Sequence, residues 1–249
     1  MAAIHESLTQ IPGVRAGDTL ANPIEDAVDK NSPPIARWLP ARQVHEFSMV
    51  AADALEPSSP LTLLAAIAMD LAPHASIAWV GRGSWPTFQH LVHAEVGGDG
   101  RLMRHVFLDP LSEGERLWAL LEIVRCPAVR VVVAEGGGMN STAGRRLQLA
   151  AEAGNAVVLL TRPASEWSKP SWAKTRWRIR PAVSSTGQPR WEIALARASG
   201  ARQGQDASRH FFVSWTYEVF LGSGALYFSS AMGCGAGTKT ASGVQRQTA

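Results

Sequence analysis

Short apolar runs separated by helical periodicity constrain the fold of this chain more than any other feature. The run 128–134 (AVRVVVA) is rich in β-branched residues and almost entirely apolar, which is typical of an interior strand of a parallel sheet. A helix is predicted to begin within 140–142 and to run to about 153, and a second apolar run follows at 156–161. Strand, helix and strand with short connections form the pattern of a parallel sheet with crossover helices. The sequence therefore predicts an α/β core.

The same alternation extends toward the N-terminus. Ser112 is a candidate N-cap with Glu115 three residues later, a capping-box pattern that predicts a helix over 113–125. Further helices are predicted over 61–71 and 85–94, and further strands over 77–80 and 106–108.

The period changes after residue 161. The segments 175–181 (TRWRIRP) and 190–198 (RWEIALARA) alternate polar or basic residues with apolar ones, as half-exposed antiparallel strands do. A second hairpin is predicted from 211–217 and 225–229. The expected architecture is a mostly parallel α/β sheet flanked by helices, with a C-terminal antiparallel β extension.

The net charge of +3 conceals a strongly uneven distribution. Nine of the 24 Lys and Arg residues lie within 162–202, together with two of the 21 acidic residues and four of the nine tryptophans. Basic residues interleaved with large aromatics are typical of a surface that contacts phosphates and stacks bases. The alternative is an antiparallel ribbon whose Trp face is buried and whose Arg face is merely solvated.

The chain divides into three parts by composition. Residues 1–35 are expected to form a flexible arm, 36–232 a single domain that contains the basic segment 162–202, and 233–249 a disordered tail rich in Gly, Ser, Thr and Gln. No apolar run approaches the roughly 18 residues that cross a bilayer, and we expect no signal peptide. The two cysteines suit a reducing compartment, so a cytoplasmic location is predicted.

Tests for catalytic motifs give little. No Walker A loop is present. The nearest imitation is the glycine-rich turn 136–144, which is followed by Arg145 and Arg146 where Lys and Ser or Thr are needed. Such a turn before a helix can still hold an anion weakly. Glu135 ends an apolar strand, and ligands bind at that edge of a parallel sheet. No spacing of His, Cys and carboxylates suits a metal, so no catalytic residue, metal or cofactor is predicted.

Three segments in order resemble one family. They are Leu39-Pro40 followed by 44–47 (VHEF), then 145–153 (RRLQLAAEA) with the strand 157–160, and finally 175–179 (TRWRI) with 189–193 (PRWEI). Together they resemble the bacterial ImuA family, whose SOS-regulated members are related to RecA and are sometimes described as SulA-like. The resemblance covers about 36–230 and implies a RecA-like fold.

The resemblance also implies where a nucleotide loop would lie. That place is occupied by Ser58, Ser59, Pro60, Leu61 and Thr62. Pro60 stands at the glycine position and Leu61 at the lysine position of the loop. Proline has no N–H to donate and leucine cannot compensate phosphate charge, so we expect the loop to be degenerate and tight triphosphate binding to be lost.

ImuA proteins act beside ImuB, a catalytically inactive relative of the Y-family polymerases, and an error-prone polymerase α subunit in translesion synthesis after DNA damage. The resemblance therefore implies a non-catalytic scaffold or modulator in SOS mutagenesis and DNA repair. Contacts to that partner pair, or to single-stranded DNA, are predicted at Arg145, Arg146, Arg176, Trp177, Arg178, Arg190 and Trp191.

Strand alternation limits this set. Arg176 and Arg178 share one face of their strand and Trp177 lies on the other, so if the arginines bind phosphate, the tryptophan belongs to the core. Two other functions stay open. One is an unconventional NTPase on DNA that uses Glu135 and the turn 136–144, and the other is a SulA-like inhibitor of cell division.

Overall fold

The computed structural model describes residues 35, 38–49, 60–86, 104–184, 187–198, 214–219 and 226–232. The strands formed by these described residues make one nine-stranded sheet in the order β3-β2-β4-β5-β1-β6-β7-β8-β9. Pairing is parallel from β3 to β6 and antiparallel from β6 to β9. The predicted class, a mostly parallel α/β sheet with an antiparallel C-terminal extension, is confirmed.

The elements follow one another along the chain as β1 (Gln43–Met49), α3 (Leu61–Leu71), β2 (Ser76–Val80), η2 (Arg82–Ser84), β3 (His105–Leu108), α5 (Glu113–Arg125), β4 (Val129–Glu135), α6 (Ser141–Ala153), β5 (Val157–Arg162), η4 (Ala164–Glu166), β6 (Thr175–Pro181), β7 (Arg190–Ala198), β8 (Ser214–Val219) and β9 (Leu226–Met232).

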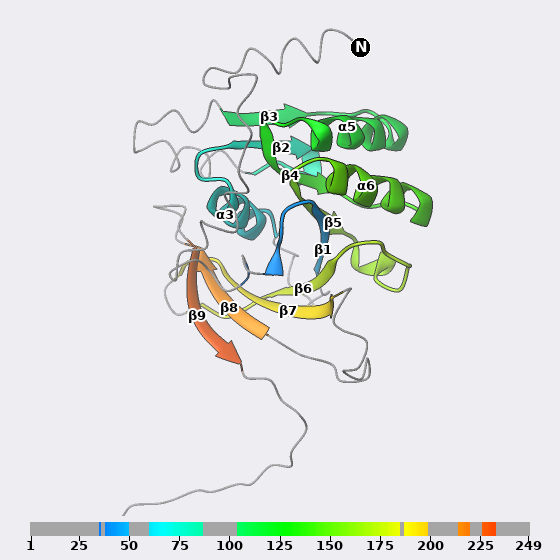
Figure 1. The fold of residues 1–249 in the computed structure, drawn as a ribbon. Coiled ribbons are helices and arrows are strands. Elements are labelled where there is room, and N and C mark those ends of the chain that lie inside the picture. The colour runs from blue at the N-terminus through cyan, green and yellow to red at the C-terminus, as the bar shows by residue number, and fades with distance from the viewer. Residues whose placement is uncertain are drawn as a thin grey trace, which may run out of the picture.

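Helices cover both faces of the sheet. Figure 1 shows α3 on one face and α5 with α6 on the other. The α3 face buries residues such as Phe47, Leu64 and Trp177, while the α5–α6 face buries a second set that includes Leu120 and Leu147. Alternate residues of β2, β4 and β5 enter the two cores, so these interior strands are apolar on both sides. The antiparallel extension curves so that β8 and β9 also contact α3.

Local sequence signals account for the helix boundaries. The Ser112 hydroxyl accepts the Glu115 N–H at 3.2 Å and so caps α5, although the Glu115 carboxylate accepts the N–H of Leu111, one residue before the cap. The Asn140 side chain accepts the Ala143 N–H at 2.9 Å and caps α6. Caps of this kind each contribute about 1 kcal/mol.

Strand β1 is the main element that the sequence patterns do not predict. It lies between β5 and β6 and pairs with both in parallel. The segment 175–181 is therefore a member of the central sheet as well as the first strand of the extension. Within the described residues, no helix is long and apolar enough to cross a membrane.

Several predictions fall wholly or mostly on residues outside the described ranges. The helix expected over 85–94 is one of them: Trp85 and Pro86 are described and are not helical. The expected tail is another, and so is the expected N-terminal arm except for Ile35. Ile35 is buried in the α3-side core, and its N–H donates to the Tyr217 hydroxyl at 3.0 Å.

Candidate functional site

A buried ion cluster occupies the carboxyl-end half of the parallel sheet. Glu46 on β1 lies between Arg162 at the end of β5 and Arg176 on β6. Its Oε1 accepts from the Arg162 Nη1 at 2.9 Å, and its Oε2 lies 2.9 Å from the Arg176 Nε as an ion pair without hydrogen-bond alignment. All three side chains are almost fully buried. The single negative charge of Glu46 is therefore shared between two buried guanidinium groups.

Glu166 of η4 supplies a second carboxylate to this cluster. Its Oε2 pairs with the Arg162 Nη2 at 3.2 Å, while its Oε1 accepts from the Lys169 Nζ at 2.8 Å and from the Gly138 N–H at 3.1 Å. The hydrogen bond from Lys169, aided by those from Gly138 and Arg162, outweighs desolvation and lowers the pKa of Glu166. The carboxylate is thus held ionised, and it ties the β5–β6 connection to the loop after β4.

The indole of Trp167 covers the outer side of the cluster. The guanidinium carbons of Arg176 and Arg178 lie 4.4 Å and 4.7 Å from its ring centroid, which is cation–π geometry. The Arg176 Nη2 also donates to the Trp167 carbonyl at 2.8 Å. Arg176 is only 7% exposed and is committed to these internal contacts. Arg176 is therefore not accessible for the contact with DNA or a partner that the sequence predicted, and that prediction is corrected.

The two tryptophans predicted as contact residues also lie in the interior. Trp177 is 0% and Trp191 2% exposed, both in the α3-side core. Trp177 stacks on Phe47 with 6.2 Å between ring centroids, and its Nε1 donates to the Thr175 hydroxyl at 2.7 Å. Neither indole reaches solvent, so their predicted role in base stacking is wrong. The physical reason is strand alternation, which turns Trp177 to the face opposite Arg178.

The other predicted contact residues lie nearer the surface. Arg145 and Arg146 are exposed on α6 and Arg178 is exposed on β6, while Arg190 on β7 is half-buried. The structure adds Trp172, which is 48% exposed in the β5–β6 connection. Its Nε1 donates to the Ser141 hydroxyl at 3.0 Å, and the Arg145 guanidinium lies 5.2 Å from its ring centroid.

Sequence reasoning missed Trp172 because it lies in a loop, where no strand period assigns a face. The only sequence signal that included Trp172 was the high number of tryptophans in the basic segment 162–202. Six of the exposed or half-buried cations and aromatics on α6, the β5–β6 connection and β6 make up what we call the basic–aromatic surface: Arg145, Arg146, Trp167, Lys169, Trp172 and Arg178. In Figure 1 the β5–β6 connection lies on the same side of the sheet as α5 and α6.

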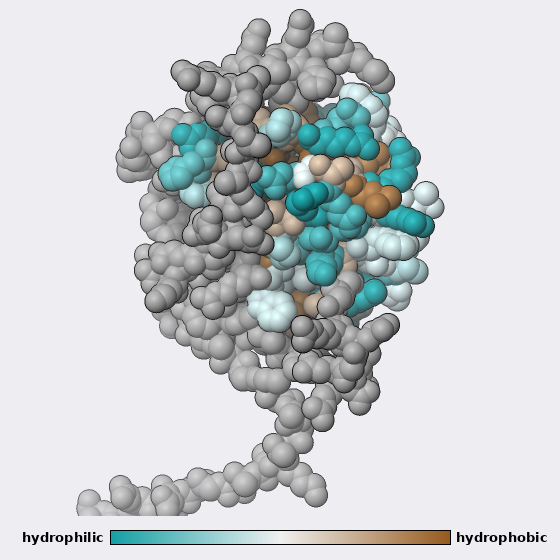
Figure 2. All heavy atoms as spheres, viewed as in Figure 1, coloured by the Kyte–Doolittle hydropathy of each residue, from teal (hydrophilic) through white to brown (hydrophobic). Residues whose placement is uncertain are grey.

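Charge on this part of the molecule is strongly one-sided. All of 141–180 is described, and its exposed charged side chains are five cations and one acid, Glu152. Glu152 lies at the far end of α6 from Arg145. Figure 2 shows one face of the molecule, on which the described residues are mostly hydrophilic, with smaller apolar areas between them.

Glu135 and the glycine-rich turn after β4 are engaged internally. The Glu135 Oε2 pairs with the Arg116 Nη1 at 3.2 Å, and its Oε1 accepts the Gly83 N–H. Arg116 also donates to the Gly137 carbonyl at 2.7 Å. The Gly138 N–H is already bonded to the Glu166 carboxylate, so these backbone groups of the turn bind side chains of the same chain. This arrangement suits a rigid support better than a cradle for a phosphate.

The predicted degenerate nucleotide loop is only partly described. Ser58 and Ser59 lie outside the described residues. Pro60 precedes α3, and its carbonyl accepts the Leu64 N–H at 2.9 Å. Leu61 and Thr62 form the first turn of α3 and are half-buried.

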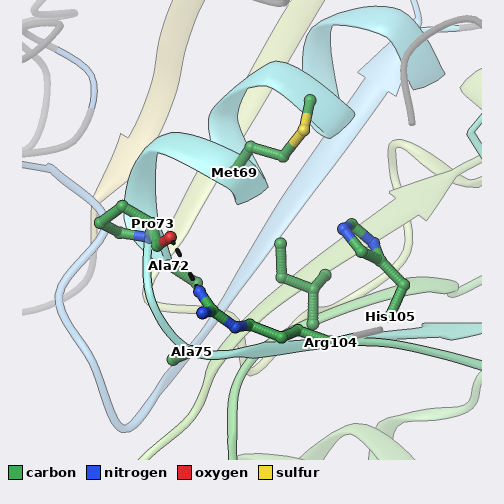
Figure 3. Close-up of a pocket in the computed structure, with 7 residues that line it drawn as sticks. Met69, Ala72, Pro73, Ala75, Arg104 and His105 are labelled. Carbon is green, nitrogen blue, oxygen red and sulfur yellow. Dashed lines mark hydrogen bonds between the residues drawn. The ribbon is translucent and has the colours of Figure 1, made fainter. Parts of the chain in front are cut away.

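A small cavity lies at the opposite edge of the sheet, near the starts of β2 and β3 (Figure 3). Its volume is about 20 Å³, which holds little more than one water molecule. The lining residues are Met69, Ala72, Pro73, Ala75, Ile77, Arg104 and His105. Burial lowers the pKa of His105 to about 4, and its Nδ1 accepts from the Trp79 Nε1 at 2.9 Å. Among the described residues no His, Cys and carboxylate group suits a metal ion.

These features define an α/β protein with a parallel sheet, an antiparallel extension and a basic–aromatic surface at one side. Part of the chain is similar to Protein ImuA from two strains of Caulobacter vibrioides: each is 40% identical over 109 residues, which cover 37% of this chain and 45% of the relative. The match thus spans less than half the length of these relatives. No family model matches the chain. The similarity confirms the predicted resemblance to the ImuA family.

Proposed function

We propose that this chain is an accessory protein of error-prone translesion DNA synthesis in the bacterial response to DNA damage. It would act in the cytoplasm as a scaffold or modulator for an ImuB-like relative of the Y-family polymerases and an error-prone polymerase α subunit. The observation that carries the proposal is the 40% identity to Protein ImuA. The basic–aromatic surface supports it, because a scaffold at a replication site needs an exposed contact face and this one is suited to DNA or a partner.

The internal contacts at the carboxyl edge support a non-catalytic role. A hydrolytic site needs a carboxylate that is free to bind a metal or activate water, whereas Glu135 is paired with Arg116. The position that the family resemblance assigns to a phosphate-binding lysine is Leu61. Both features count against the NTPase alternative.

Complementation tests the role directly. The chain is expressed in a bacterium that lacks its own ImuA homologue but retains the ImuB and polymerase genes, and ultraviolet-induced mutation frequency is measured. We expect induced mutagenesis to be restored, and the tagged chain to capture ImuB from damaged cells. Unrestored mutagenesis, with the chain expressed and folded, would refute the proposal.

The two alternatives have their own assays in the same cells and with the same protein. DNA-stimulated ATP hydrolysis that Glu135→Gln abolishes would establish the NTPase. Capture of the tubulin-like division protein without the polymerase, together with filamentous growth, would establish the division inhibitor.

A further inference from the structure

We infer that Trp172 is a base-stacking platform for single-stranded DNA, with Arg145, Arg146 and Arg178 as the phosphate contacts around it. The inference rests on the proposed function, since it names the ligand of the basic–aromatic surface. It replaces the two buried tryptophans of the sequence-based hypothesis with one that the fold places in solvent.

Trp172 is held in place before any ligand arrives. Its indole N–H is bonded to the Ser141 hydroxyl at 3.0 Å, at the first residue of α6. The Arg145 guanidinium lies 5.2 Å from the ring centroid, and a Cβ on Gly144 would lie 3.7 Å from the ring, so the indole packs close to the helix backbone. With 48% of the residue exposed, a fixed aromatic surface faces solvent. Preorganisation lowers the entropic cost of stacking a base.

The charges on α6, which contacts Trp172, and on β6, which follows the loop of Trp172, favour an anionic ligand. Arg145, Arg146 and Arg178 are exposed, and nothing acidic within 141–180 is exposed except Glu152. The one acid in the β5–β6 connection, Glu166, is neutralised by Arg162 and Lys169 and does not repel a phosphate. A second cation–aromatic pair, Arg178 with Trp167, lies in contact with the same connection.

Single-stranded DNA matches this chemistry better than a duplex or an acidic protein. It alternates flat bases with phosphates, and its bases are free to stack on an aromatic ring. In a duplex the bases already stack on each other and expose only their edges. An acidic peptide satisfies the arginines but makes no use of an exposed indole that is fixed in one orientation.

The test compares two labelled ligands of equal length, oligothymidylate and an abasic phosphodiester, by fluorescence anisotropy with the full chain. Trp172→Ala should weaken oligothymidylate binding by about tenfold, in line with the loss of one base stack, and leave abasic binding nearly unchanged. Trp172→Phe should recover most of the affinity. Arg145→Ala should weaken both ligands and reduce the salt slope by about 0.7, the share of one phosphate contact on a single strand.

Matched controls come from α5. Trp118 is 41% exposed and Arg125 is exposed and paired with Glu122, so Trp118→Ala and Arg125→Ala should leave binding unchanged. Urea unfolding of every variant checks that each one folds.

Equal loss of oligothymidylate affinity in Trp172→Ala and Trp118→Ala, or none in either, would overturn the inference. Loss of ImuB capture in Trp172→Ala with DNA affinity intact would also overturn it and assign the surface to a protein. In both cases restored mutagenesis by the wild-type chain leaves the proposed function standing, whereas DNA binding without restoration rejects that function alone.

Discussion

Replacing the buried Glu46 with Gln should strongly destabilise the fold. Glu46 makes two ion-pair contacts of 2.9 Å, to Arg162 and Arg176, and the three side chains are between 5% and 9% exposed. A glutamine keeps the size but removes the charge, which leaves two buried guanidinium groups with only Glu166 near them. Removing one partner of a buried ion pair costs about 3–5 kcal/mol.

The assay is urea unfolding followed by far-ultraviolet circular dichroism. With a slope of about 3 kcal/mol per molar urea, that loss corresponds to a fall in midpoint of roughly 1 M or more. Glu122→Gln is the matched control, because Glu122 and Arg125 form an exposed pair at 3.6 Å on α5 and such pairs contribute at most about 1 kcal/mol.

A double-mutant cycle isolates the interaction itself. Glu46→Gln and Arg176→Gln should be non-additive by more than about 1 kcal/mol, because residues in one buried network couple. A midpoint for Glu46→Gln as high as that of Glu122→Gln, or strictly additive effects in the cycle, would refute the reasoning and show that the cluster is solvated.

Three further predictions concern stability. Burial lowers the pKa of His45 to about 4, so between pH 7 and pH 4 the unfolded chain binds a proton at this residue before the folded chain does. The free energy of unfolding should therefore fall by about 3 kcal/mol over this pH range. In His45→Gln the urea midpoint should change less between pH 7 and pH 4. Arg42 adopts φ 64°, so Arg42→Gly should be more stable than Arg42→Ala by about 1 kcal/mol; equal melting temperatures would contradict the strain. A Cβ on Gly154 would clash with a backbone carbonyl of α5, whereas a Cβ on Gly114 would meet only the Ser112 hydroxyl at an ordinary contact distance of 4.0 Å. Gly154→Ala should therefore lower the melting temperature, and Gly114→Ala should raise it, because the helix propensity of alanine stabilises a helix by about 0.5–1 kcal/mol relative to glycine.

Local patterns were sufficient for most of the elements. The capping residues Ser112 and Asn140 act within their own helices, and the strands β6 and β7 have the residue bounds that their alternation predicts. These signals depend on neighbours one to four positions away, so the sequence carries them in full.

Strand β1 shows where local patterns are insufficient. It contains His45, Glu46 and Ser48, and all three are buried, so its sequence does not read as an interior strand. Their partners are supplied from far along the chain, by Thr175 for His45 and by Arg162 for Glu46. A polar residue becomes compatible with a sheet interior only when such partners arrive, and that depends on which strands become neighbours.

The basic segment divides in the same way. The sequence alone determined that positive charge and tryptophan gather near the C-terminal strands, and that Arg178 and Trp177 point to opposite faces. Only the tertiary structure decided that Arg176 forms a buried ion pair with Glu46. It also decided that Trp177 and Trp191 belong to the core, and that Trp172 faces solvent beside Arg145. The physical reason is that exposure and ion pairing are properties of what packs against a residue, and packing joins segments that the sequence keeps more than 100 residues apart.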